Sequence, residues 1–142
     1  PWLTQDDQRA KWEVYVHDVS RLQGDAANPG STRFLLIRDA EGRSDTALEQ
    51  TLSAFPGREI DFLRGSEVFE GNLSFKLTPK DACTVELEVR EVWRSQAYME
   101  RFWSFSKSGA RKKRLEESLD SLTYWLNHTG ACLENASAGS AN

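Results

Sequence analysis

The chain has 142 residues, 39% of them hydrophobic, with five Trp, seven Phe, three Tyr and a formal net charge of −4. A chain of this length can fold as one domain without disulfide bonds or bound metal ions to stabilise it, and its aromatic content excludes intrinsic disorder of the whole chain. No run of about 18 uncharged apolar residues occurs, so the sequence predicts no membrane-spanning helix.

The first predicted element is a helix that begins at residues 4–7, because Thr-Gln-Asp-Asp resembles a capping box and its acidic residues suit a helix N-terminus. Residues 11–19 fit two structures. Their large apolar residues recur at helical spacing, but residues 12–16 also alternate and are rich in strand formers. Helix and strand both remain open for this segment.

The next three segments predict a loop, a strand and a helix. Residues 24–31 are rich in turn formers and predict an exposed loop. The continuous apolar run at residues 34–37 predicts a central strand buried on both faces. Residues 44–55 predict a short helix, because their apolar residues fall about one helical turn apart and Pro56-Gly57 ends the pattern.

Residues 58–93 change to the alternation of strands, with apolar side chains at every second position and glycine or proline between the runs. They predict three antiparallel strands with one solvent-exposed face. Residues 98–105 and 115–126 return to helical spacing and predict two helices, one on each side of Lys107-Ser108-Gly109.

Together these elements follow the order (α)βαβββαα and predict an α+β fold. We expect a mixed, mostly antiparallel sheet of four to five strands with helices packed on one face. A single domain is predicted over residues 1–130. The small, polar residues 131–142 predict a flexible tail.

The two cysteines, Cys83 and Cys132, lack the spacing of a CxxC redox motif or a four-ligand zinc site. They form either one disulfide or two free thiols. A disulfide would place the protein in an oxidising compartment, such as a cell envelope or the exterior, and free thiols would favour the cytoplasm. Asn-X-Ser/Thr triplets at Asn72, Asn127 and Asn135 leave glycosylation open.

No catalytic, metal or cofactor motif is found. The chain has only two histidines, His17 and His128, and each has an ordinary structural explanation, so a Ser-His-Asp or Cys-His arrangement is not expected. Neither GxGxxG nor GxxxxGK[ST] occurs, which argues against a nucleotide-dependent enzyme. We therefore predict a protein that is not an enzyme and needs no cofactor.

A basic, aromatic region stands out against the acidic remainder. Residues 90–114 carry a local charge of +6 and include five aromatic residues. Arg and aromatic side chains are enriched at the cores of protein interfaces, so this region predicts a site for a protein partner. The predicted partner-binding residues are Arg94, Arg101, Trp103, Lys107, Arg111, Lys112, Lys113 and Arg114.

The sequence leaves three functional hypotheses, the first two based on these residues and the third on the fold class alone. The first is a protein-binding module, of an accessory, inhibitor or immunity type. The alternative is a small nucleic-acid-binding domain, because cations and stacking rings are what a single strand needs. The second alternative is an enzyme or small-ligand carrier with a pocket between sheet and helices. Residues 111–114 also have a simpler interpretation, as a solvated basic turn that forms ion pairs with Glu116 and Glu117.

Overall fold

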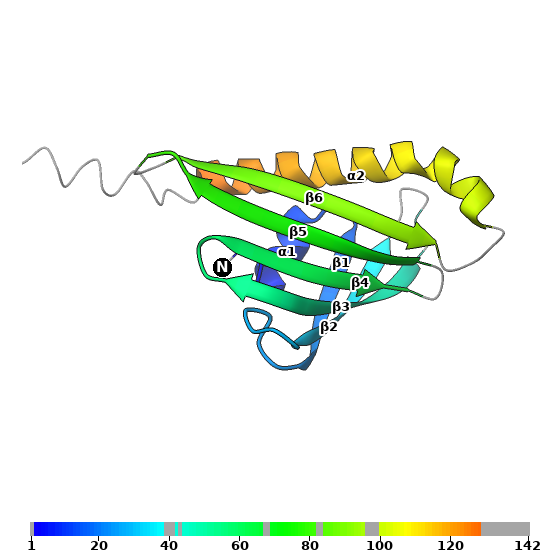
Figure 1. Cartoon of the computed structure of the whole chain (residues 1–142), viewed down its shortest axis with the longest axis horizontal. Coiled ribbons are helices and arrows are strands. Elements are labelled where there is room, and N and C mark those ends of the chain that lie inside the picture. The colour runs from blue at the N-terminus through cyan, green and yellow to red at the C-terminus, as the bar shows by residue number, and fades with distance from the viewer. Residues whose placement is uncertain are drawn as a thin grey trace, which may run out of the picture.

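In a computed structural model of the chain, one antiparallel sheet is covered on one face by two helices (Figure 1). The structure describes residues 2–38, 42, 44–66, 69–81, 84–95 and 100–128, and of residues 69, 95 and 100–108 it describes only the backbone. The helices are α1 (Asp6–Trp12) and α2 (Glu100–His128). The strands are β1 (Val16–Gln23), β2 (Thr32–Arg38), β3 (Ser44–Phe55), β4 (Glu59–Gly65), β5 (Phe69–Pro79) and β6 (Val85–Ser95).

The sheet is a simple meander. Its six strands lie in the order of the chain, and every neighbouring pair is antiparallel. The α+β class is confirmed, but the predicted order and the mixed sheet of four to five strands are wrong, because the observed order is αββββββα. Short hairpin connections join only antiparallel neighbours, which is why a meander contains no parallel pair.

The two alternatives for residues 11–19 each hold for part of the segment. Helix α1 ends at Trp12, and β1 begins at Val16. The predicted capping residue is wrong, because the N-cap of α1 is Gln5 and makes no side-chain capping hydrogen bond. The predicted loop at residues 24–31 is confirmed between β1 and β2.

The strand predicted around residues 34–37 exists as β2, but its predicted central position and two-sided burial are wrong. It lies second from the edge of the sheet, and Phe34 on its outer face is exposed. Phe34 pairs across the sheet with Leu48, which is also exposed. The apolar run therefore belongs to a strand whose outer face is apolar and exposed, not to a strand enclosed between two layers.

Residues 44–55 form the strand β3 instead of the predicted helix. Their inward positions are Ala47, Glu49 and Thr51, all buried, whereas Leu48 and Leu52 are exposed. The prediction failed because it took the exposed leucines for the buried face. A buried glutamate at the inward position conceals the alternation that marks a strand.

The three antiparallel strands predicted between residues 58 and 93 are confirmed as β4, β5 and β6. The two predicted C-terminal helices are one continuous helix, α2, that passes through Gly109. A lone glycine inside a helix costs only about 1 kcal/mol, which packing elsewhere along the helix offsets. Cys83, Cys132 and the predicted tail at 131–142 lie outside the described residues.

The main core lies between the helices and the inner face of β4 and β5. Phe75 meets both Trp12 and Phe62 edge to face, at ring-centroid distances of 5.9 and 6.2 Å. Leu122 of α2 closes this cluster, and Trp2 and Trp125 stack beside it. A smaller cluster of Val16, Leu35 and Ala47 lies on β1 to β3. Tryptophans 2, 12 and 125 thus serve the core.

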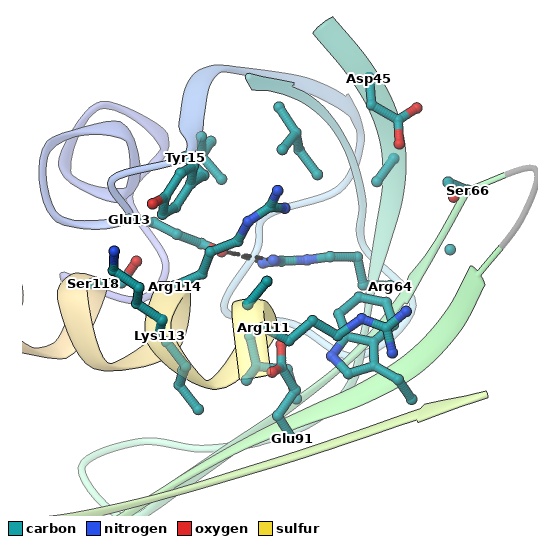
Figure 2. A pocket seen from close by; sticks show the side chains of 18 of the residues that line it. Glu13, Tyr15, Asp45, Arg64, Ser66, Glu91, Arg111, Lys113, Arg114 and Ser118 are labelled. Atoms are coloured by element: carbon teal, nitrogen blue, oxygen red, sulfur yellow. Dashed lines mark hydrogen bonds and ion pairs between the residues drawn. The ribbon is translucent and has the colours of Figure 1, made fainter. Parts of the chain in front are cut away.

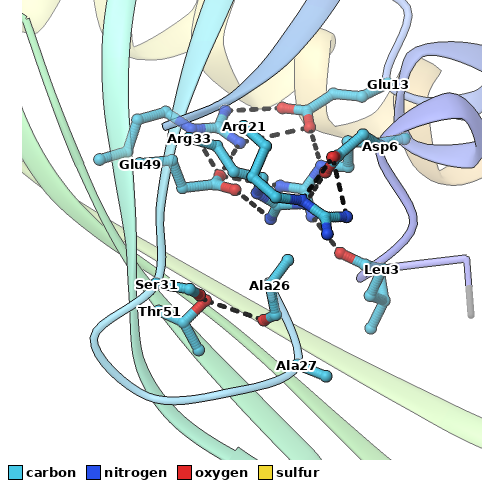
Figure 3. Close-up of polar contacts among 12 residues, drawn as sticks. Leu3, Asp6, Glu13, Arg21, Ala26, Ala27, Ser31, Arg33, Glu49 and Thr51 are labelled. Atoms are coloured by element: carbon cyan, nitrogen blue, oxygen red, sulfur yellow. Dashed lines mark hydrogen bonds and ion pairs between the residues drawn. The ribbon is translucent and has the colours of Figure 1, made fainter. Parts of the chain in front are cut away.

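Five charged residues lie buried between α1 and the sheet, and we call them the buried charge network: Arg9, Glu13, Arg33, Glu49 and Arg64 (Figure 3). Arg33, Glu49 and Arg64 are cross-strand neighbours on β2, β3 and β4. Glu49 accepts hydrogen bonds from Arg33 at 2.5 Å, Arg64 at 2.5 Å and Arg9 at 3.0 Å. Glu13 accepts from Arg9 at 2.5 Å and from Arg64 at 2.6 Å.

The network rests on aromatic rings and reaches the surface through Asp6. The Arg9 guanidinium carbon lies 4.9 Å from the ring centroids of both Trp12 and Phe62. Asp6 accepts from Arg33 at 3.4 Å and from the more exposed Arg21 at 3.2 Å. Burial alone would raise the pKa of Glu49, but the guanidiniums of Arg9, Arg64 and Arg33 outweigh it and hold the pKa below its usual value.

Removing one carboxylate from the network should therefore be costly. Glu49→Gln keeps the shape but leaves three buried guanidiniums without their shared counter-ion, and we expect a loss of about 3–5 kcal/mol in the free energy of unfolding. Urea unfolding followed by tryptophan fluorescence measures it. The matched control Glu88→Gln, on an exposed position of β6, should cost less than about 1 kcal/mol. Equal losses in the two variants would contradict the assigned role of the network.

Candidate functional site

A cavity of ≈ 660 Å³ lies between α2 and the inner face of the sheet (Figure 2). Its walls come from the end of α1, the segment that leads into β1, the inner faces of β2 to β6, and residues 110–118 of α2. Much of the wall is apolar or aromatic and includes Trp12, Val16, Leu73, Phe75, Trp93 and Leu115. Charged side chains converge on it from several elements, so the cavity is amphipathic.

One end of the cavity is closed where α2 docks on the segment between α1 and β1. The Tyr15 hydroxyl donates a hydrogen bond to Glu117 at 2.5 Å, and the backbone N–H of Val14 donates to the Ser118 hydroxyl at 3.3 Å. The Arg114 guanidinium lies over the Tyr15 ring, 4.8 Å from its centroid. These contacts hold the middle of α2 in place and keep its basic residues near the cavity.

The opposite wall is built by β5 and β6. Trp93 faces inward opposite Gly71, and a side chain at Gly71 would collide with the indole, since a Cβ there would lie 2.5 Å from two ring atoms. Glycine at this position therefore lets the ring lie flat on β5. The indole N–H of Trp93 is buried and has no hydrogen-bond acceptor among the described residues. Such a donor is costly to leave unsatisfied.

Glu91 lies two residues before Trp93 and faces the same side of the sheet, opposite Leu73. Burial raises the pKa of Glu91 above its usual value, and the Trp93 indole and the charges of Arg64 and Arg111 offset this only in part. The Trp93 N–H lies near the Glu91 carboxyl without the geometry of a hydrogen bond. A carboxyl in this setting retains its proton more readily than an exposed one.

The floor of the cavity is the edge of the buried charge network. Glu13 and Arg64 both line the cavity and are joined at 2.6 Å (Figure 2). Burial would raise the pKa of Glu13, but the adjacent guanidiniums of Arg64 and Arg9 outweigh it and lower the pKa to about 2. Glu13 is thus a fixed anion neutralised by its partners, in contrast to Glu91.

The structure brings together some of the residues that the sequence singled out. Arg111, Lys113 and Arg114 line the cavity, and Arg111 lies over the Trp93 ring at 5.7 Å. Lys112 is exposed and forms an ion pair with Glu116 at 3.7 Å, and Lys113 pairs with Glu117 at 3.8 Å. These two pairs confirm the ion-pair part of the simpler interpretation for Lys112 and Lys113. The predicted solvated turn is wrong, because the segment lies inside the helix α2 and Arg111 and Arg114 are partly buried.

The remaining predicted site residues are not part of the cavity as described. Arg94 is exposed on β6, opposite Glu70. For Arg101, Trp103 and Lys107 the structure describes only the backbone, within the first part of α2. Cys83 and Cys132 lie outside the described residues, so the disulfide stays a prediction.

Sequence reasoning missed Glu13, Arg64 and Glu91 as cavity residues. A signal existed for Glu91, because Leu87 and Val89 alternate inward and the same register continues through Glu91 to Trp93. Glu91 interrupts the apolar side chains at these inward positions, so the apolar alternation alone does not mark it as a cavity residue. Glu13 and Arg64 meet across 51 positions of the chain, which local patterns do not reveal.

The comparisons with known proteins show the fold and no activity. No protein-family model matches the chain, and no curated protein matches it either. An uncharacterized protein from Rhizobium leguminosarum is 15% identical, with a TM-score of 0.63, and the match covers 89% of this chain and 82% of that one. A protein from Rhodobacter sphaeroides is 17% identical, with a TM-score of 0.60 and coverage of 88% and 80%. A protein from Mycobacterium smegmatis is 10% identical, with a TM-score of 0.61 and coverage of 90% and 81%.

Two further searches of the described residues bear on the site. Neither helix, as far as it is described, has the length and apolar character needed to cross a bilayer. Within the same part of the chain, no three side chains of His, Cys, Asp or Glu are gathered as a metal ion would require.

The pKa of Glu13 leads to a testable dependence of stability on pH. A carboxyl whose pKa is about 2 when folded and 4.5 when unfolded stabilises the fold above pH 4.5 and loses that contribution as the pH falls toward 2. The full effect is of order 3 kcal/mol. In urea unfolding at a series of pH values, Glu13→Gln should be less stable than the parent near neutrality, and the difference should shrink as the pH falls. A difference that does not change with pH would contradict this.

Proposed function

We propose that the protein binds a small organic molecule in the cavity between α2 and the inner face of the sheet. The observation that carries the proposal is the cavity itself. Its volume, ≈ 660 Å³, lies within the range of about 300–1,000 Å³ that small-molecule and cofactor sites occupy. Its walls also have the composition of such sites, with many apolar and aromatic side chains and a few converging polar groups.

The position of the cavity within the fold supports the same proposal. It adjoins the main core, where Leu73 and Phe75 are almost fully buried, yet both residues also line the cavity. A protein of this size usually fills such a space with side chains. Instead, Ala47 and Ala110 stand at the cavity wall, and Gly71 allows the Trp93 ring to lie back on β5. Small residues at these positions keep the volume open.

We favour binding over catalysis because the charged groups at the floor already neutralise one another. Arg64 is held by both Glu13 and Glu49, so neither carboxylate is placed to take a proton from a ligand. The described lining contains no histidine or cysteine. The role of small-ligand carrier therefore suits these side chains better than that of an enzyme.

The two other functions expected from the sequence stay predictions. Protein or nucleic-acid binding by residues 94–114 would use cations that face solvent. Three of the basic residues instead line the cavity, and Lys112 and Lys113 already pair with neighbouring glutamates. These contacts favour the cavity as the first site to test.

The proposal is tested by titrating the protein with N-phenyl-1-naphthylamine, a neutral dye that fluoresces in apolar surroundings. We expect saturable binding, and a loss of about tenfold or more in affinity in Ala110→Trp, because the new ring enters the cavity. The matched control is Lys112→Trp, on the same helix but not part of the cavity wall. It should bind the dye like the parent. No saturable binding by the parent, or equal binding by all three proteins, would overturn the proposal.

A further inference from the structure

We infer that the ligand is an organic carboxylate with an apolar, ring-containing body, and that its carboxylate sits beside Glu91, Trp93 and Arg111 with uptake of a proton. This inference rests on the proposed function and adds the chemical class of the ligand and the part of the cavity that recognises it. It is argued from the position of one buried donor, from the charges on the cavity wall, and from the surroundings of Glu91.

The Trp93 indole supplies the first argument. Its N–H is buried at the cavity wall near the Glu91 carboxyl, and within the part of the chain that the structure describes it makes no hydrogen bond of normal geometry. The ring lies against Gly71, with no space to sink further into the sheet. A bound molecule with a hydrogen-bond-accepting oxygen at this place would satisfy the donor. An apolar group or an ammonium group would leave it unsatisfied.

The balance of charge supplies the second argument. Arg64, on β4, is already matched by Glu13 and Glu49. On the same wall Lys113 pairs with Glu117 and Asp45 adds a negative charge, whereas Arg111 lies over the Trp93 ring. An anionic end group placed at Trp93 therefore lies next to the Arg111 guanidinium, which would repel a cationic one. Guanidinium and indole donors on one side suit the oxygens of a carboxylate.

As an anion, Glu91 would repel a bound carboxylate. The groups that act on it are Arg64 of β4, Arg111 of α2, Glu13 before β1 and the neighbouring Trp93 indole. Burial dominates and raises the pKa of Glu91 above its usual value, so its carboxyl takes up a proton more easily than an exposed one. A bound carboxylate nearby would raise this pKa further, since two like charges in one site disfavour each other. The protonated carboxyl then donates a hydrogen bond to the ligand anion.

The sign of the pH effect follows from this coupling. When the bound complex holds a proton on Glu91 that the free protein lacks, binding takes up that proton, and affinity for the anion falls as the pH rises. A neutral ligand of the same shape takes up no proton and shows no such fall. The pH dependence of binding thus separates a carboxylate beside Glu91 from a ring held by apolar contact alone.

The test is calorimetric titration with three ligands of one shape: 2-naphthylacetate, 2-ethylnaphthalene and 2-naphthylmethylamine. At about pH 6 we expect the acetate to bind about tenfold or more tightly than 2-ethylnaphthalene, and the amine to bind weakest. The affinity for the acetate should fall about fivefold or more between about pH 6 and about pH 8. Titrations in two buffers of different ionisation enthalpy measure the proton uptake directly.

Two substitutions assign the effect to residues. Glu91→Gln keeps a neutral donor in place, so it should bind 2-naphthylacetate with little pH dependence and without proton uptake. Trp93→Phe keeps a ring on Gly71 but removes the N–H. It should lower the affinity for 2-naphthylacetate about tenfold and leave the affinity for 2-ethylnaphthalene almost unchanged. The controls Glu88→Gln and Trp125→Phe change the same residue types outside the cavity wall and should behave like the parent.

The outcomes separate this inference from the proposed function. If the neutral dye binds but the three naphthyl ligands bind equally, or the amine binds best, the inference is overturned and the cavity proposal stands. The same holds if the affinity for the acetate is independent of pH in the parent protein. If neither the dye nor any naphthyl ligand binds, both proposals fall.

Discussion

The buried charge network is the constraint on which the rest of the structure depends. Three buried guanidiniums, two of which lie over aromatic rings, are tolerable only if carboxylates meet them with good geometry. Glu49 on β3 reaches arginines from α1, β2 and β4, and Glu13 binds two of the same arginines. A shift of one residue in the register of β3 would turn Glu49 to the outer face and remove the carboxylate that all three cations share. The network therefore constrains the strand register and the position of α1.

The network also explains where the cavity lies. Arg33, Glu49 and Arg64 form a row across β2, β3 and β4, and the register continues that row to Gly71 on β5 and Trp93 on β6. The first part of the row is filled by ion pairs. Gly71 has no side chain, and the row ends at the Trp93 indole, which lies against Gly71. The cavity occupies this part of the inner face, with α2 as its outer wall.

The sequence was sufficient for the α+β class and for β4 to β6, because most of their inward residues, apart from Arg64 and Glu91, are apolar and alternate with polar ones. It failed at β3 for a physical reason. Glu49 and Thr51 occupy inward positions that the pattern assigns to apolar residues, and only partners distant in the chain make them acceptable there. The basic segment of α2 was recognised as unusual, and three of its residues reach the cavity. The part of β6 that faces α2 across the cavity was not recognised, because Glu91 interrupts the apolar alternation of β6 as Glu49 interrupts that of β3.

Glu13 and Glu91 show how one cavity can hold two carboxyls with opposite properties. Both are inward-facing and largely removed from water, so burial raises the pKa of each. Glu13 touches Arg9 and Arg64 directly, and their charges outweigh burial and fix it as an anion. Arg64 also lowers the pKa of Glu91, but its charge is already neutralised by Glu13 and Glu49, so burial dominates. Pairs of carboxyls whose surroundings separate their pKa values are typical of functional sites. In this fold the difference between the two pKa values follows from the network. Arg64 is neutralised by Glu13 and Glu49, so among the described residues of the sheet it does not serve as a counter-ion for Glu91.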